Sequence, residues 1–92
     1  MNESELVTKI KKALKNKRGG RWVKIHGGPY QEAGVSDIIG CYNGIFYALE
    51  VKLPGKEKKL TPIQKAFIED INASGGKATM ITSVEEALSF VK

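Results

Sequence analysis

The dipeptide Asn43-Gly44 lies between two apolar runs and restricts the fold of this chain more than any other feature. Both residues accept the positive φ that a two-residue type I′ turn requires, so the pattern predicts a β-hairpin. Counting outward from the turn gives the register: Tyr42 opposite Ile45, Cys41 opposite Phe46, Ile39 opposite Ala48, and Asp37 opposite Glu50.

The open end of this hairpin carries charged residues, whereas the rest is almost wholly apolar. Asp37 and Glu50 should face the same side of the sheet, and Lys52 points to that side because it lies two residues beyond Glu50. Two opposed carboxylates repel, so one of them should titrate abnormally unless a divalent cation lies between them. Mg²⁺ suits such a site, since one or two carboxylates commonly hold it together with water and phosphate oxygens. The alternative is a salt-bridged cluster in which Lys52 neutralises the acids without metal.

Composition limits the organisation of the chain and its partners. The 92 residues predict one domain, 1–92, with a net charge of +5 that favours an anionic partner, nucleic acid first. A basic surface with no partner is the alternative. The single cysteine, Cys41, excludes an intramolecular disulfide and a cysteine zinc site, and we expect it to be a small buried residue. No apolar run suggests a membrane span or a signal peptide, so we expect an intracellular, cytoplasmic protein with no membrane partner.

The remaining pattern predicts an α/β fold with a small mixed β-sheet flanked by helices in the order αβββαβα. Apolar strands in the hairpin indicate helices on both faces of the sheet, and the strand after residue 76 should run parallel to its neighbour because a helix precedes it. Three sequences resemble capping boxes, at Asn2/Glu5, Thr61/Gln64 and Ser83/Glu86. The predicted elements are a helix over 3–17, a strand over 21–26, the hairpin, a helix from 62 to about 73, a strand over 77–82 and a helix ending near 91.

The ordered motifs resemble the PD-(D/E)XK nuclease superfamily, and more narrowly the small stand-alone phage or bacterial form of the VRR-Nuc (virus-type replication–repair nuclease) family. The resemblance covers nearly the whole chain. One departure is Ser36, which replaces the proline usually found before the aspartate; because that proline is not a metal ligand, the change leaves the implied metal site intact. The matching segments are Glu3-x-x-Leu6, Lys24-Ile25-His26-Gly27, Gly34-Val35-Ser36-Asp37, Glu50-Val51-Lys52, Thr61-Pro62-Ile63-Gln64, Gly75-Gly76 and Ser83-Val84-Glu85-Glu86.

The resemblance implies a restriction-endonuclease-like fold and a Mg²⁺- or Mn²⁺-dependent endonuclease that hydrolyses DNA. Duplex or branched DNA, such as a Holliday junction in repair, would be the substrate, and a homodimer would present two sites. By position, the resemblance implies Asp37, Glu50 and the Val51 carbonyl as metal ligands, with Glu3 as the acid that completes the site. Lys52 would be the catalytic lysine, and Gln64 would lie near the site.

Several of these residues can also be explained by a purely structural role. Glu3 lies on the buried edge of its helix yet also suits a first-turn acid, and Glu5 competes with it for the metal role. A capping box accounts fully for Gln64, and Trp22 is better explained by packing than by base stacking. Basic residues that could contact DNA phosphates are Lys24, His26, Lys56, Lys58 and Lys59, together with the lysines of the first helix, Arg18 and Arg21. Two other functions remain open: a non-catalytic nucleic-acid-binding module, and a protein whose basic surface binds an acidic protein.

Overall fold

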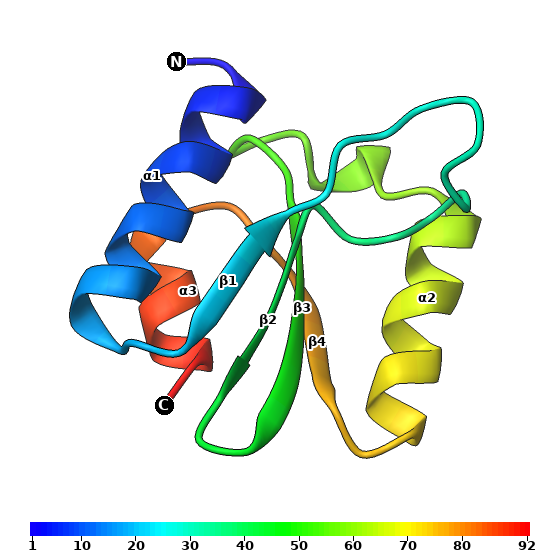
Figure 1. Cartoon of the computed structure of the whole chain (residues 1–92). Helices are drawn as coiled ribbons and strands as arrows, with labels where there is room; N and C mark the ends of the chain where they lie inside the picture. The colour runs from blue at the N-terminus through cyan, green and yellow to red at the C-terminus, as the bar shows by residue number, and fades with distance from the viewer.

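The computed structural model describes residues 1–92 as a four-stranded mixed sheet with three α-helices in the order αβββαβα (Figure 1). The predicted fold class is therefore confirmed. None of the helices is both long and apolar enough to span a membrane. The elements are α1 (Glu3–Lys17), β1 (Arg21–Lys24), β2 (Ile38–Tyr42), β3 (Ile45–Val51), the short 3₁₀ helix η1 (Glu57–Lys59), α2 (Pro62–Ala73), β4 (Lys77–Ile81) and α3 (Val84–Phe90).

Two helices begin with the predicted capping boxes. At α1, Asn2 Oδ1 accepts a hydrogen bond from Glu5 N at 2.8 Å, and Glu5 Oε1 accepts one from Asn2 N at 2.9 Å. At α2, Thr61 Oγ1 accepts from Gln64 N at 3.2 Å, and Gln64 Oε1 accepts from Thr61 N at 3.0 Å. Each pair satisfies two backbone N–H groups that would otherwise lack a partner at the helix start.

The third predicted capping box is wrong. Ser83 Oγ accepts a hydrogen bond from Glu86 N, but the Glu86 carboxylate accepts from Thr82 N at 2.5 Å and Thr82 Oγ1 at 2.6 Å. These two donors, Oγ1 first, lower the pKa of Glu86. The carboxylate therefore binds the residue before the cap, because Thr82 offers two donors where the Ser83 backbone offers one.

The predicted hairpin and its register are confirmed. Asn43 and Gly44 have φ of 54° and 80°, as a type I′ turn requires. In the hairpin, Tyr42 pairs with Ile45, Cys41 with Phe46 and Ile39 with Ala48. The sheet order is β1-β2-β3-β4, with β4 parallel to β3 and the other pairs antiparallel.

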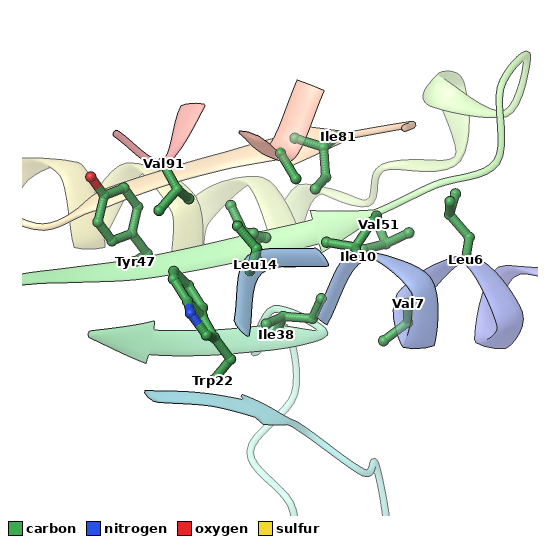
Figure 2. Packing of buried hydrophobic residues seen from close by; sticks show 12 residues of the cluster. Leu6, Val7, Ile10, Leu14, Trp22, Ile38, Tyr47, Val51, Ile81 and Val91 are labelled. Atoms are coloured by element: carbon green, nitrogen blue, oxygen red, sulfur yellow. The ribbon is translucent and has the colours of Figure 1, made fainter. Parts of the chain in front are cut away.

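Helices α1 and α3 lie on one side of the sheet and α2 on the other (Figure 1). The main core fills the space under α1 and α3, as Figure 2 shows. In it, the fully buried Tyr47 ring lies with its centroid 5.9 Å from those of Trp22 and Phe90. Trp22 Nε1 also donates to Gly19 O at 2.7 Å, so the predicted packing role of Trp22 is confirmed.

The second face of the sheet is covered only in part. Helix α2 packs against β4 and β3 and makes few contacts with β1 and β2. Cys41 on β2 is therefore exposed, and the prediction that it is buried is wrong. Val23 and Phe46, which share this face by strand register, are likewise about 40% exposed.

Arg18 holds the end of α3 against the end of α1. Its Nε donates to Val91 O at 2.5 Å and its Nη2 donates to Leu88 O at 2.6 Å. A cation at a helix C-terminus also interacts favourably with the helix dipole. Arg18 thus has a structural role, and its expected place in a DNA-contacting patch stays a prediction.

Gly40→Ala is expected to destabilise the fold by about 3 kcal/mol, because a Cβ at residue 40 would meet Arg21 O at 2.3 Å and the Trp22 ring at 2.4 Å. Gly27→Ala is the matched control, since a Cβ there meets no atom within 4 Å. Urea unfolding of both variants measures the difference. An unchanged midpoint for Gly40→Ala would contradict the close approach of Trp22 to β2.

Candidate functional site

Three charged residues come together at one end of the sheet. Asp37 immediately precedes β2, Glu50 is the penultimate residue of β3, and Lys52 follows β3. Asp37 Oδ2 accepts a hydrogen bond from Val51 N at 2.8 Å, and Lys52 Nζ lies 3.6 Å from Glu50 Oε2. The hairpin register, confirmed up to Ile38 opposite Leu49, continues to place Asp37 beside Glu50.

Burial gives Glu50 an abnormal titration. Only 2% of the residue is exposed, and its Oε1 is buried without a hydrogen-bond partner. Burial first, and then the adjacent Asp37 carboxyl, raise the pKa of Glu50 to about 8, while Lys52 acts in the opposite direction. This raised pKa agrees with the prediction that one of the two acids titrates abnormally.

The site fits a hard divalent cation that keeps part of its water shell. The buried Glu50 Oε1 has a free lone pair, and the Asp37 carboxyl adjoins it. No group of three or more His, Cys, Asp or Glu side chains arranged to hold a metal occurs in the chain. Mg²⁺ and Mn²⁺ tolerate so few protein carboxylates because water and substrate phosphate complete their coordination.

The structure brings Glu3 less close to the site than the resemblance implies. Glu3 is half-buried in the first turn of α1, and Leu6 in the next turn lies near Val51 (Figure 2). It nevertheless forms no three-carboxylate group with Asp37 and Glu50. The competing acid, Glu5, is engaged in the α1 capping box, so Glu3 is the better of the two for a site role.

Gln64 and Val51 are accounted for by structural contacts. The Gln64 side-chain oxygen accepts from Thr61 N in the α2 cap, so its second lone pair and its amide NH₂ remain for a ligand. Val51 is fully buried and its N–H donates to Asp37, so its carbonyl oxygen is not open to solvent. The site roles of both residues stay predictions.

A cavity of about 290 Å³ leads to Asp37. It is lined by Ile25, Asp37 and residues of the loop between β1 and β2. This loop reaches the start of α2, where a Cβ on Gly34 would come within 2.7 Å of Ile63 O. Asp37 is half-buried while Glu50 and Lys52 are buried, so a ligand entering from this cavity meets Asp37 first.

Two polar features near the site were missed in the sequence analysis. Ser36 is fully buried, and its Oγ has no hydrogen-bond partner beside Asp37. Glu32 lines the same cavity as Asp37. The only sequence signal for Ser36 is a polar residue at the motif position where proline is usual.

The predicted basic contacts surround the same end of the sheet. Lys24 ends β1 opposite Ile38, and its Nζ donates to Ser4 Oγ at 3.1 Å. His26 is exposed in the loop after β1, and both this loop and the segment after β3 lie at the site end in Figure 1. The exposed lysines of that second segment are Lys56, Lys58 and Lys59.

No protein-family model matches this sequence, and no curated protein matches it. The site geometry and the charges around it therefore carry the functional proposal.

Proposed function

We propose that this protein is a Mg²⁺- or Mn²⁺-dependent nuclease that hydrolyses DNA phosphodiester bonds and is similar to VRR-Nuc domains of the PD-(D/E)XK superfamily. The single observation that carries the proposal is the buried, unpartnered Glu50 Oε1 beside Asp37 and Lys52. Burying a carboxyl without a partner costs free energy, so such groups in a native protein call for a functional explanation.

Each residue of the cluster has a distinct task in this proposal. Asp37 and Glu50 would hold the ion, and the Val51 N–H orients the Asp37 carboxylate through its hydrogen bond. A bound Mg²⁺ supplies a Lewis acid for the scissile phosphate and lowers the pKa of bound water. Lys52 either orients the attacking water or stabilises negative charge that develops on the phosphate.

The basic residues at the site end would hold the DNA backbone without reading sequence. Lys24, His26 and the lysines after β3 flank the cluster, and phosphate contacts of this kind fix position alone. We further propose duplex or branched DNA, including Holliday junctions, as substrate, a homodimer that presents two sites, and the cytoplasm of a bacterial or phage-infected cell as the location.

A non-catalytic nucleic-acid-binding module is the second candidate. Lys52 Nζ lies 3.6 Å from Glu50 Oε2, and no third carboxylate joins the cluster. A protonated Glu50 beside Lys52 would leave the site balanced without metal. Such a protein would keep the basic surface and bind DNA without cutting it.

Cleavage of supercoiled plasmid and of a four-way junction tests the proposal. We expect products in Mg²⁺ or Mn²⁺, none in EDTA, and a loss of at least about 100-fold in Glu50→Gln, because the variant cannot supply an anionic ligand. Glu86→Gln is the control, since the carboxylate of this exposed acid accepts hydrogen bonds from Thr82 and takes no part in the cluster.

Retained DNA binding with no cleavage in either metal would contradict the nuclease and support the module. Equal cleavage by wild type and Glu50→Gln would show that the products come from a contaminating nuclease or another site.

A further inference from the structure

We propose that a basic pocket between α1 and the start of β1 binds a backbone phosphate of the nucleic acid at a distance from the cleavage site. The identity of the ligand as nucleic acid rests on the proposed function. The pocket has a volume of about 220 Å³ and is lined by Lys11, Lys15, Gly20, Arg21 and Trp22.

The three cations of this pocket have no acidic partner. No carboxylate lines the pocket, and the only ion pair within 4.0 Å in the chain joins Lys52 to Glu50. Lys11 and Lys15 are four residues apart on α1, a spacing at which like charges repel. An anion bound between the two lysines would relieve this repulsion and would also be attracted by the positive charge of Arg21.

The walls of the pocket are fixed by the fold. Trp22 is 5% exposed, and the hydrogen bond from its Nε1 to Gly19 O holds the turn that precedes β1. Residue 20 has φ of +81°, and a Cβ there would lie 2.5 Å from Cys41 O, so only glycine lets this turn approach β2. The cations are thus attached to a rigid frame, which lowers the entropic cost of binding.

Phosphate suits the pocket better than a nucleobase. The indole ring of Trp22 is buried and leaves little face for a nucleobase to stack on. The two lysines act as point charges toward a phosphate, and Arg21, whose strand register places it on the Cys41 face of the sheet, adds positive charge at the edge of β1. At about 30 Å³ per water molecule, the volume of 220 Å³ accommodates a phosphate group with several waters.

The position of the pocket excludes the scissile phosphate. Arg21 lies opposite Cys41 on β2, whereas Asp37 is four residues back along the same chain. At about 3.3 Å per residue, these positions are separated by roughly 13 Å, or about four nucleotide steps of 3.4 Å. A DNA strand held in the pocket would extend the bound length of DNA beyond the cleavage site.

Fluorescence anisotropy of a labelled four-way junction and a duplex in EDTA tests the pocket without any need for cleavage. The pocket variant is Lys11→Gln/Lys15→Gln/Arg21→Gln. The matched control is Lys9→Gln/Lys12→Gln/Lys17→Gln, which removes the same charge from exposed positions of α1 outside the pocket.

We expect the pocket variant to bind at least about 10-fold more weakly at 0.15 M salt than the control variant. Its plot of log K against log salt should also lose about one unit of slope relative to the control, as expected for one lost phosphate contact. Equal loss of affinity and slope in the two variants would overturn the proposal, because charge alone would then explain binding. Thermal melts of both variants check that they fold.

Titration with inorganic phosphate separates two sources of the ligand. We expect the NMR chemical shifts of the Gly20 and Arg21 amides to change in the wild type and to stay unchanged in the pocket variant. Junction binding by the wild type should weaken as the phosphate concentration rises. Saturable phosphate binding with junction affinity unchanged in the pocket variant would overturn the nucleic-acid assignment and indicate a free phosphorylated molecule. If the wild type binds but never cuts, only the nuclease proposal fails.

Discussion

Glu50→Gln is expected to raise the melting temperature of the metal-free protein at pH 8 and to abolish stabilisation by Mg²⁺. The carboxyl of Glu50 is buried, its Oε1 has no partner, and Asp37 opposes its ionisation. Gln keeps the shape of Glu without the charge, so it avoids that cost. Mg²⁺ stabilises a folded state only by binding it, and the variant keeps only one of the two carboxylates that would hold the ion.

The pH dependence of stability follows from the same carboxyl. Its pKa rises from 4.5 in the unfolded chain to about 8 in the folded protein, so between these values the folded state binds the extra proton. The stabilisation from Glu50 is complete below pH 4.5 and is lost as pH rises to about 8. Within this window the free energy of unfolding should fall by up to about 1.4 kcal/mol per pH unit.

Urea unfolding of wild type and Glu50→Gln in EDTA from pH 4.5 to 9 measures this slope as a difference between the two proteins. Glu86→Gln is the control, because the lowered pKa of Glu86 makes its stabilisation present above pH 4.5 and lost only in more acidic solution. Parallel curves for wild type and Glu50→Gln would show that Glu50 ionises freely. With 10 mM Mg²⁺, the wild-type loss above pH 7 should shrink because the ion replaces the proton.

The arrangement of the cluster could be predicted from local rules. Asn43 and Gly44 suit one turn type, and the two-residue length of the turn fixes the strand register that places Asp37 beside Glu50. The side-chain period of two in a strand then puts Lys52 on the same side, as its distance of 3.6 Å from Glu50 confirms. The helix starts at Asn2 and Thr61 were predictable for the same reason, since a cap involves only residues three apart.

Features that depend on distant parts of the chain could not be predicted. Arg18 bonds to Leu88 and Val91, 70 and 73 residues away, and no local pattern distinguishes it from the neighbouring cations. Cys41 is exposed because α2 covers only part of its face of the sheet, and the width of that cover depends on how the helix packs. The depth of burial that raises the pKa of Glu50 is likewise a property of the assembled core.

Lys52→Met is expected to lower the cleavage rate by about 10²–10⁴-fold while Mg²⁺ still stabilises the protein. The range corresponds to the loss of one group that moves a proton or stabilises charge in the transition state. Met has a similar length and suits a site that is only 7% exposed, so the fold should persist. Single-turnover cleavage at saturating Mg²⁺ measures the rate, and thermal melts with and without Mg²⁺ measure binding of the ion.

Lys77→Met provides the control, because this exposed lysine begins β4 opposite Tyr47 and has no proposed contact with DNA or with the cluster. Removing Lys52 also removes the charge that lowers the pKa of Glu50, so that pKa should move above 8 in Lys52→Met. The pH at which Mg²⁺ begins to stabilise the variant should then rise in parallel. A lysine that only balanced charge would shift this pH and leave the rate at saturating metal unchanged, whereas a catalytic lysine changes both.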